Sequence, residues 1–146
     1  MRITLGFCIL SLIVSLSCTD NTDEDRISIL NYLDSNGLVS KDTSGVFVVI
    51  QVPGGAEKPK ETSTFRIKYT GYYMDGEIFD KSSGNDGVVL KLSSAVKGLR
   101  IGLGKFGKNS KGTILIPSGL GYANNPPFGI RHNAILIYDV EVLDFF

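Results

Sequence analysis

Cysteine and histidine are scarce in this 146-residue chain, and tryptophan is missing altogether. Cys8 and Cys18, the two cysteines, both precede residue 20, so the body of the chain has no thiol for a disulfide or a thiolate metal site. His132 is the single histidine, which argues against a zinc site and against a Ser-His-Asp hydrolase. We therefore expect no metal and no cofactor.

Net charge is missing too, because fifteen basic residues balance fifteen acidic ones. The molecule therefore has no overall positive electrostatic field that would attract a polyanion, and nucleic acid is not an expected partner. The content of apolar residues, 42%, and of charged residues, 21%, is ordinary for a globular protein. The length predicts one domain with a true core.

The apolar run at the N-terminus is too short for a comfortable membrane span. Residues 3–16 carry no charge and follow Met1-Arg2, a pattern that fits a secretory signal peptide over residues 1–17. Ser17-Cys18 resembles the cleavage box of bacterial lipoproteins, in which the cysteine is lipidated, although Ser15 stands where leucine is usual. We expect an extracytoplasmic protein anchored to a membrane through Cys18. The alternative is a plain signal peptide with a coincidental cysteine.

Residues 18–44 are predicted to form a tether that contains a short helix. The tether begins with a polar, acidic stretch. Thr22, with Asp25 three residues later, supplies an N-terminal cap signal. The apolar positions that we expect on one side of the helix are Ile27, Leu30 and Leu33.

Residues 45–146 alternate between strand and turn signals, with one helical segment in the middle. Strands are predicted over 46–52, 65–80 (a hairpin), 88–92, 113–116 and 134–143, and a helix over 95–106. Gly98, Gly102 and Gly104 weaken that helix intrinsically, so a sheet must pack against it and hold it. The pattern predicts an α+β fold, with an antiparallel sheet folded over the helix.

The glycines near the end of this helix imitate a nucleotide-binding motif. Gly102, Gly104 and Gly107 satisfy G-x-G-x-x-G, but they lie in or after a helix and precede a strand, the reverse of the required order. Asn109 occupies the position at which a P-loop needs serine or threonine. Nucleotide is therefore not an expected partner.

The hairpin over residues 65–80 is the most informative stretch of the chain. Its first strand alternates apolar and polar residues, Asp75-Gly76 favours a tight turn, and Phe79-Asp80 places a ring beside a carboxylate. Such a pair can build an apolar pocket with one polar group. It can equally be a half-buried hairpin with a surface acid, and these residues alone leave both interpretations open.

Four motifs resemble FKBP-type peptidyl-prolyl cis-trans isomerases. They are Tyr69-Thr70-Gly71 with Phe79-Asp80, residues 95–99 (AVKGL), residues 116–122 (IPSGLGY) and residues 133–141 (NAILIYDVE). The resemblance implies that residues 45–146 form one FKBP-like domain, a half-barrel of five or six antiparallel strands around one short helix. It also implies a pocket between the sheet and the helix, a site that binds macrolide immunosuppressants in this family.

The resemblance assigns a role to nine side chains. The expected walls are Tyr69, Phe79, Tyr138, Val88, Val96 and Ile130, with Leu99 as the floor, Asp80 at one side and the Tyr122 hydroxyl at the rim. Leu99 stands where the family usually has tryptophan, and Val88 where it usually has phenylalanine. Asp80 has two possible roles, an electrostatic one near the twisting bond and a structural one as a hydrogen-bond acceptor.

The resemblance therefore predicts a monomeric isomerase of Xaa-Pro bonds that assists the folding of extracytoplasmic proteins. Its partners would be proline-containing polypeptides. The alternative is a binding or chaperone module on the same fold, with catalysis weakened or lost through Leu99 and Val88.

Overall fold

The computed structural model describes residues 21–146, so Cys18 and the predicted signal peptide lie outside the described residues. The helices are α1 (Asn21–Ser35) and α2 (Lys97–Leu103), with short 3-10 turns η1 (Leu92–Ser94) and η2 (Ser118–Leu120). The strands are β1 (Lys41–Thr43), β2 (Val46–Val52), β3 (Thr64–Tyr72), β4 (Ile78–Lys81), β5 (Val88–Lys91), β6 (Ser110–Ile116) and β7 (Leu136–Phe145). Within these residues no helix is long and apolar enough to cross a membrane.

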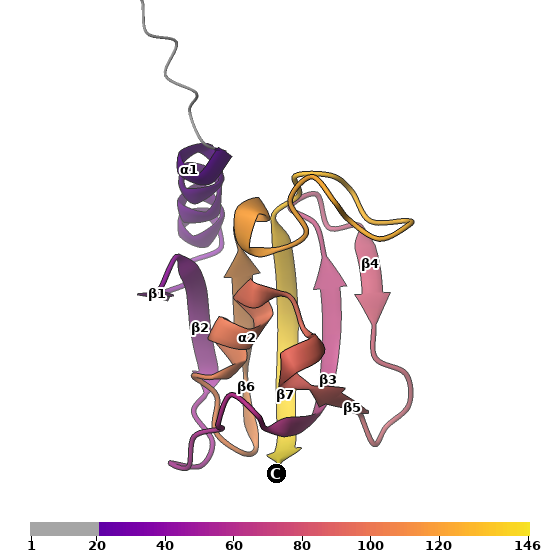
Figure 1. Cartoon of the computed structure of the whole chain (residues 1–146). Helices are drawn as coiled ribbons and strands as arrows, with labels where there is room; N and C mark the ends of the chain where they lie inside the picture. Colours follow the sequence, from indigo (N-terminus) through magenta and orange to yellow (C-terminus); the bar gives the residue numbers. More distant parts are fainter. Residues whose placement is uncertain (1–20) are drawn as a thin grey trace, which may run out of the picture.

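The strands form one antiparallel sheet in the order β1-β2-β6-β7-β3-β4, with β5 paired to β3 as well (Figure 1). The α+β antiparallel fold predicted from the sequence is confirmed. The sheet has seven strands instead of five or six for two reasons. The short β1 pairs with β2 as an additional edge strand. Strand β3 is long enough to pair with β5 along its first half and with β4 at its end.

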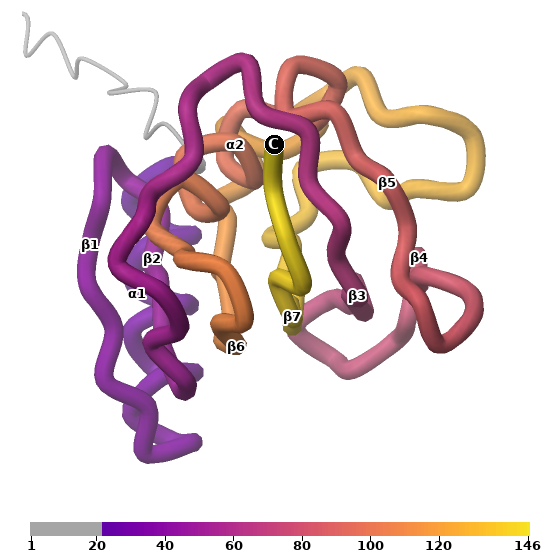
Figure 2. The backbone as a smooth tube through the Cα atoms, turned by 90° about the horizontal axis from the view of Figure 1, so that it is seen from below, coloured from indigo at the N-terminus to yellow at the C-terminus, as the bar shows by residue number. Residues whose placement is uncertain are grey.

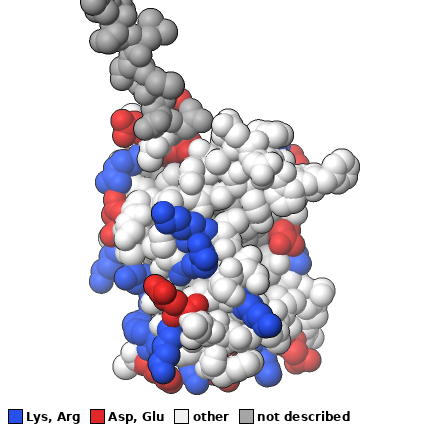
Figure 3. Space-filling view, in the orientation of Figure 1, with Lys and Arg blue, Asp and Glu red and all other residues white. Residues whose placement is uncertain are grey.

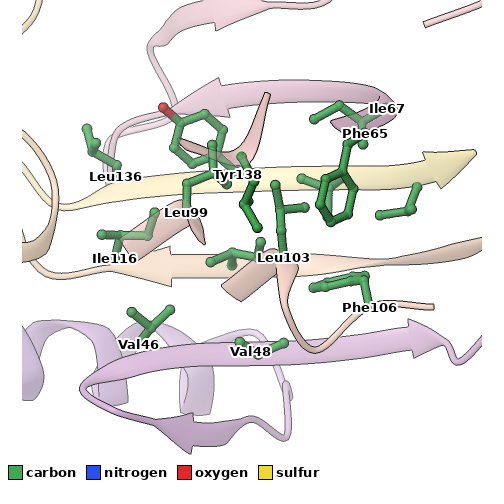
Figure 4. Packing of buried hydrophobic residues seen from close by; sticks show 14 of the residues in the cluster. Val46, Val48, Phe65, Ile67, Leu99, Leu103, Phe106, Ile116, Leu136 and Tyr138 are labelled. Carbon is green, nitrogen blue, oxygen red and sulfur yellow. The ribbon is translucent and has the colours of Figure 1, made fainter. Parts of the chain in front are cut away.

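The sheet curves around α2, and this inner face holds the larger core (Figure 2). Leu99 and Leu103 point from α2 toward Ile116 and Tyr138 of the sheet (Figure 4). A Cβ atom at Gly98 would overlap Ile116, and one at Gly102 would lie 2.5 Å from Ile114 Cγ2. The glycines that weaken the helix intrinsically are therefore what lets it approach the sheet closely.

The boundaries of several elements differ from the predicted ones. Helix α2 is only seven residues long, because Ser94 belongs to η1 and Val96 takes the N-cap position. Beyond Leu103 the chain turns, and Phe106 packs fully buried as a loop residue. Strand β6 begins three residues earlier than predicted and β7 two residues later. The glycine run lies at the C-terminal end of α2 and before a strand, as the sequence predicted.

Helix α1 covers the opposite face of the sheet, where it builds a second, smaller core. Ile29 and Leu33 are buried against Phe47, Val49, Leu115, Ile135 and Ile137. The predicted apolar side of this helix is wrong at two positions, since Ile27 is 60% and Leu30 45% exposed. The buried positions recur every four residues, at Asp25, Ile29 and Leu33, and so lie one turn apart on one face. Residues 21–44 thus pack on the sheet through α1 and β1.

Candidate functional site

The β3–β4 hairpin places three of the predicted site residues together. Gly76 turns the chain with φ +85°, and the Glu77 N–H donates to the Asp75 carboxylate (3.1 Å). A Cβ atom at Gly71 would lie 2.7 Å from the Phe79 ring and 3.0 Å from the Tyr138 ring. Because position 71 has no side chain, both rings can lie over the strand at this point. The Tyr-Thr-Gly motif thereby makes room for the aromatic residues that follow it.

Four aromatic rings form a continuous cluster at this end of the sheet. Phe79 meets Tyr138 edge to face with 5.5 Å between ring centroids, and Tyr69 lies 6.0 Å from Tyr138. Tyr73 lies 4.9 Å from Phe79 and was not predicted as a site residue. Tyr138 and Tyr73 are buried, whereas Tyr69 and Phe79 are partly exposed. The cluster therefore presents aromatic surface to solvent over a buried aromatic base.

Asp80 uses both carboxylate oxygens within the hairpin. The Tyr69 hydroxyl donates to Oδ2 (2.8 Å) and the Lys81 N–H donates to Oδ1 (2.8 Å). Asp80 thus holds the Tyr69 ring in place as an acceptor, which corresponds to the structural one of its two predicted roles. An additional electrostatic role stays a prediction.

Burial raises the pKa of three tyrosine hydroxyls at the candidate site, those of Tyr69, Tyr122 and Tyr138. Burial, together with the Asp80 hydrogen bond, raises the pKa of Tyr69 to about 12. Burial also raises the pKa of Tyr122, and the nearby charge of Asp80 adds to this shift. Burial raises the pKa of Tyr138, with smaller contributions from Tyr122 and Asp80. These hydroxyls therefore keep their protons at neutral pH, and the proton of Tyr69 is already donated to Asp80.

Three of the predicted aliphatic site residues lie on strand β5 and at helix α2. Leu99 is 7% exposed and lies beside Tyr138 (Figure 4). Val96 and Val88 are partly buried and pack against the same core. Val96 is the N-cap of α2, and the N–H groups at the start of a helix have no acceptor within it.

The loop between β6 and β7 carries Ile130, which is partly exposed and belongs to neither packed cluster. Its neighbour Arg131 fastens this loop to the hairpin. The Arg131 N–H donates to the Tyr73 hydroxyl (3.0 Å), and its guanidinium lies 4.2 Å from the Tyr73 ring centroid. The same guanidinium pairs with Asp75 (2.7 Å) and with Glu77. Ile130 is thus held near the aromatic cluster through the neighbouring residue.

The face of this loop that is seen in Figure 3 is largely uncharged, whereas Arg131 forms an exposed charged group with Asp75 and Glu77 of the hairpin. On the face seen in Figure 1, charged side chains gather over α2 and the lower strands, and few lie over the β6–β7 loop (Figure 3). Phe128, in this loop, is fully exposed. Aromatic and aliphatic surface with a few hydroxyl donors suits an apolar ring flanked by peptide carbonyls.

The fold is thus a half-barrel sheet around α2, and the candidate site combines aromatic rings with tyrosine hydroxyls. Residues 55–143 match the family model of the FKBP-type peptidyl-prolyl cis-trans isomerases. The chain belongs to this family.

Individual relatives agree with the family assignment. The chain is 31% identical over 126 residues to the FKBP-type peptidyl-prolyl cis-trans isomerase FkpA of Escherichia coli strain K12. The aligned region covers 86% of this chain and 46% of that protein. It is 31% identical over 127 residues to FkpA of Buchnera aphidicola from Schizaphis graminum, covering 86% and 50% respectively. The chain thus spans about half the length of the curated relatives it matches.

Solved structures show the same fold. A peptidyl-prolyl cis-trans isomerase from Pseudomonas syringae matches with a TM-score of 0.74 at 22% identity, over 86% of this chain and 92% of that one. FkpA from Escherichia coli matches with a TM-score of 0.73 at 28% identity, over 86% of this chain and 59% of that one.

Proposed function

We propose that this protein catalyses the cis-trans isomerisation of Xaa-Pro peptide bonds in extracytoplasmic proteins and thereby assists their folding, as a monomer. The observation that carries the proposal is the aromatic cluster of Tyr69, Phe79 and Tyr138 beside buried Leu99, with Tyr122 packed against the same core. Val88, Val96 and Ile130 would extend this surface with aliphatic groups, as the family resemblance implies.

The reaction needs no nucleophile or proton shuttle. Rotation about an Xaa-Pro bond crosses a barrier of about 18–20 kcal/mol, because amide resonance is lost at the twisted transition state. The twisted carbonyl is less polar than the planar one, so an apolar surface disfavours the planar form more strongly. The rings would hold the pyrrolidine, while the Tyr122 hydroxyl and the Val96 N–H would bind flanking carbonyls and fix the ends of the peptide.

An isomerase assay on residues 21–146 tests the proposal. We expect the protein to accelerate cis-to-trans conversion of a chromogenic Xaa-Pro peptide. The heat-denatured protein should leave the conversion at its uncatalysed rate. The runner-up function, a binding or chaperone module, is favoured by Leu99, whose side chain offers less stacking area than the usual indole. Peptide binding without turnover would support that alternative, and the absence of both binding and turnover would contradict both functions.

A larger side chain at Leu99 should tighten the binding of macrolide immunosuppressants, the ligands that fill this pocket in the family. Trp in place of Leu99 adds stacking area at the base of the cluster, and we expect a gain of about 1–3 kcal/mol, or roughly 5- to 150-fold in Kd. Calorimetry on Leu99→Trp and wild type measures the difference, with Ile101→Trp on the same helix as the control. An unchanged or weaker affinity in a folded Leu99→Trp protein would show that Leu99 is not the floor.

The proposed location rests on the N-terminal sequence. A charged start, an apolar run and Ser17-Cys18 fit a signal peptide whose cleavage leaves a lipidated Cys18 as the first residue. The polar residues after Cys18 lead directly into α1, which is docked on the sheet. The anchor would therefore hold the domain close to the membrane surface.

Labelling cells with a tagged fatty acid tests the anchor. We expect the wild-type protein to be labelled and the Cys18→Ala variant to be unlabelled, because the thiol of Cys18 is the acceptor. Cys8→Ala is the matched control and should be labelled like the wild type, since residue 8 lies within the segment to be removed. Equal labelling of the wild type and Cys18→Ala would exclude lipidation at this cysteine.

A further inference from the structure

Helix α1 inserts a carboxylate into the base of the loop that carries Tyr122. Asp25 is 9% exposed, and its Oδ2 accepts hydrogen bonds from both the Ser118 N–H (2.7 Å) and the Ser118 hydroxyl (2.6 Å). Ser118 is itself only 2% exposed. Asp25 was predicted to contribute to the cap of its own helix, but its side chain instead joins two segments 93 residues apart.

Ser118 in turn fixes the backbone on both sides of Tyr122. Its carbonyl oxygen accepts hydrogen bonds from the Gly121 N–H (3.0 Å) and from the Ala123 N–H (3.0 Å). Ala123 has a φ of +48°, an unfavourable value for alanine that the surrounding contacts must maintain. The Asn133 N–H closes the loop by donating to the Ala123 carbonyl (2.8 Å). Tyr122 therefore projects from a turn whose starting point is held by Asp25.

Docking of α1 does not itself require a buried charge. Ile29 and Leu33 bury the helix on the sheet, and Arg26 adds an ion pair with Asp42 (2.5 Å) and a contact with the Phe47 ring (5.1 Å). A buried carboxylate is costly to desolvate, and an apolar residue of similar volume is often as stabilising. A carboxylate that receives two hydrogen bonds from one residue has a more specific effect, because it fixes the orientation of that residue.

We propose that Asp25 is a positioning residue for the site, and that α1, which lies outside the matched residues 55–143, acts on Tyr122 through Ser118. Only the expected loss of kcat/KM rests on the proposed function; the effect of Asp25 on the turn that carries Tyr122 does not depend on it. Without the carboxylate, the Ser118 N–H and hydroxyl lose their partner in a buried place. The η2 turn then loosens, and the Tyr122 hydroxyl is no longer held where it meets the substrate carbonyl.

Kinetics of full-length variants test the coupling. We expect Asp25→Ala to lower kcat/KM by about tenfold at most. Asp25 acts through Tyr122, so its removal cannot cost more than the loss of the Tyr122 hydrogen bond to the substrate. Asp25→Asn keeps an acceptor oxygen and should stay within about threefold of wild type. Glu24→Ala, an exposed acid on the same helix, should leave activity unchanged. In a Tyr122→Phe background, Asp25→Ala should cost less than about twofold, because the two changes act on one interaction. Equal losses in both backgrounds would overturn the proposal.

Amide hydrogen exchange decides the structural part without any assay of activity. In Asp25→Ala we expect the Gly121 and Ala123 amides to exchange at least about tenfold faster, while the core amides of β7 keep their protection. Unchanged exchange at Gly121 and Ala123 would overturn the proposal, and so would a uniform increase along the chain. If the wild type does not turn over peptide, the proposed function fails, and this measurement still decides whether Asp25 holds the Tyr122 turn.

Discussion

Replacement of Phe79 by alanine should lower kcat/KM by about a hundredfold, which corresponds to about 2.7 kcal/mol of lost transition-state stabilisation. The Phe79 ring lies between Tyr73 and Tyr138, with centroids at 4.9 and 5.5 Å. Its removal takes away one face of the apolar surface and admits water beside the remaining rings. Both effects weaken the preference for the less polar, twisted amide.

The comparison with Tyr122→Phe makes this expectation specific to the mechanism. That variant removes one hydrogen bond, worth about 0.5–1.5 kcal/mol net, and should cost around tenfold in kcat/KM. Asp80→Asn keeps the shape of the carboxylate and an acceptor for the Tyr69 hydroxyl. A large loss in Asp80→Asn would therefore support the electrostatic role of Asp80.

Steady-state kinetics at several peptide concentrations, with near-UV circular dichroism as a check on folding, would order the three variants. If Tyr122→Phe abolished turnover while Phe79→Ala remained near wild type, catalysis by an apolar surface would be wrong for this protein.

Much of the candidate site could be predicted from the sequence because several of its residues lie close together in the chain. Tyr69, Phe79 and Asp80 belong to one hairpin, in which strand alternation, an Asp-Gly turn and direct pairing determine which side chains meet. Tyr73 could have been found by the same alternation, since positions 65, 67, 69 and 71 all lie on the face of β3 that carries the larger core and position 73 continues the series. Their catalytic roles stay predictions, whereas their proximity is now a structural observation.

Sequence patterns could not predict the contacts between residues that lie far apart in the chain. The Arg131 contacts with the hairpin span 54 to 58 residues, and the Asp25 contact with Ser118 spans 93. No periodicity or turn signal specifies such pairs, because they depend on where the sheet brings two loops together. The length of α2 was mispredicted for a related reason. The apolar stripe that suggested a longer helix includes Phe106, which is buried from a turn.

The face that α1 buries is the other feature that the pattern did not reveal. The helix contains Ile27, Ile29, Leu30 and Leu33, so two different stripes are possible, and a spacing of three selected the wrong one. What decides between them is the surface that receives the helix. Phe47, Val49, Leu115 and Ile137 project from three strands on the outer face of the sheet and accept Ile29 and Leu33. The second core therefore depends on residues that lie far from α1 in sequence.

Two isoleucines on α1 give a matched test of this second core. Ile29 is 0% exposed and Ile27 is 60% exposed, so the same substitution probes a buried and a solvated position two residues apart. Ile29→Ala should lower the free energy of unfolding by about 2–5 kcal/mol, whereas Ile27→Ala should change it by less than about 0.5 kcal/mol. The change in helix propensity is the same in both variants and cancels in the comparison. Urea unfolding followed by circular dichroism should show a lower midpoint for Ile29→Ala alone, with one transition if α1 unfolds together with the sheet. Similar midpoints for the two variants would mean that α1 does not pack on the sheet through Ile29.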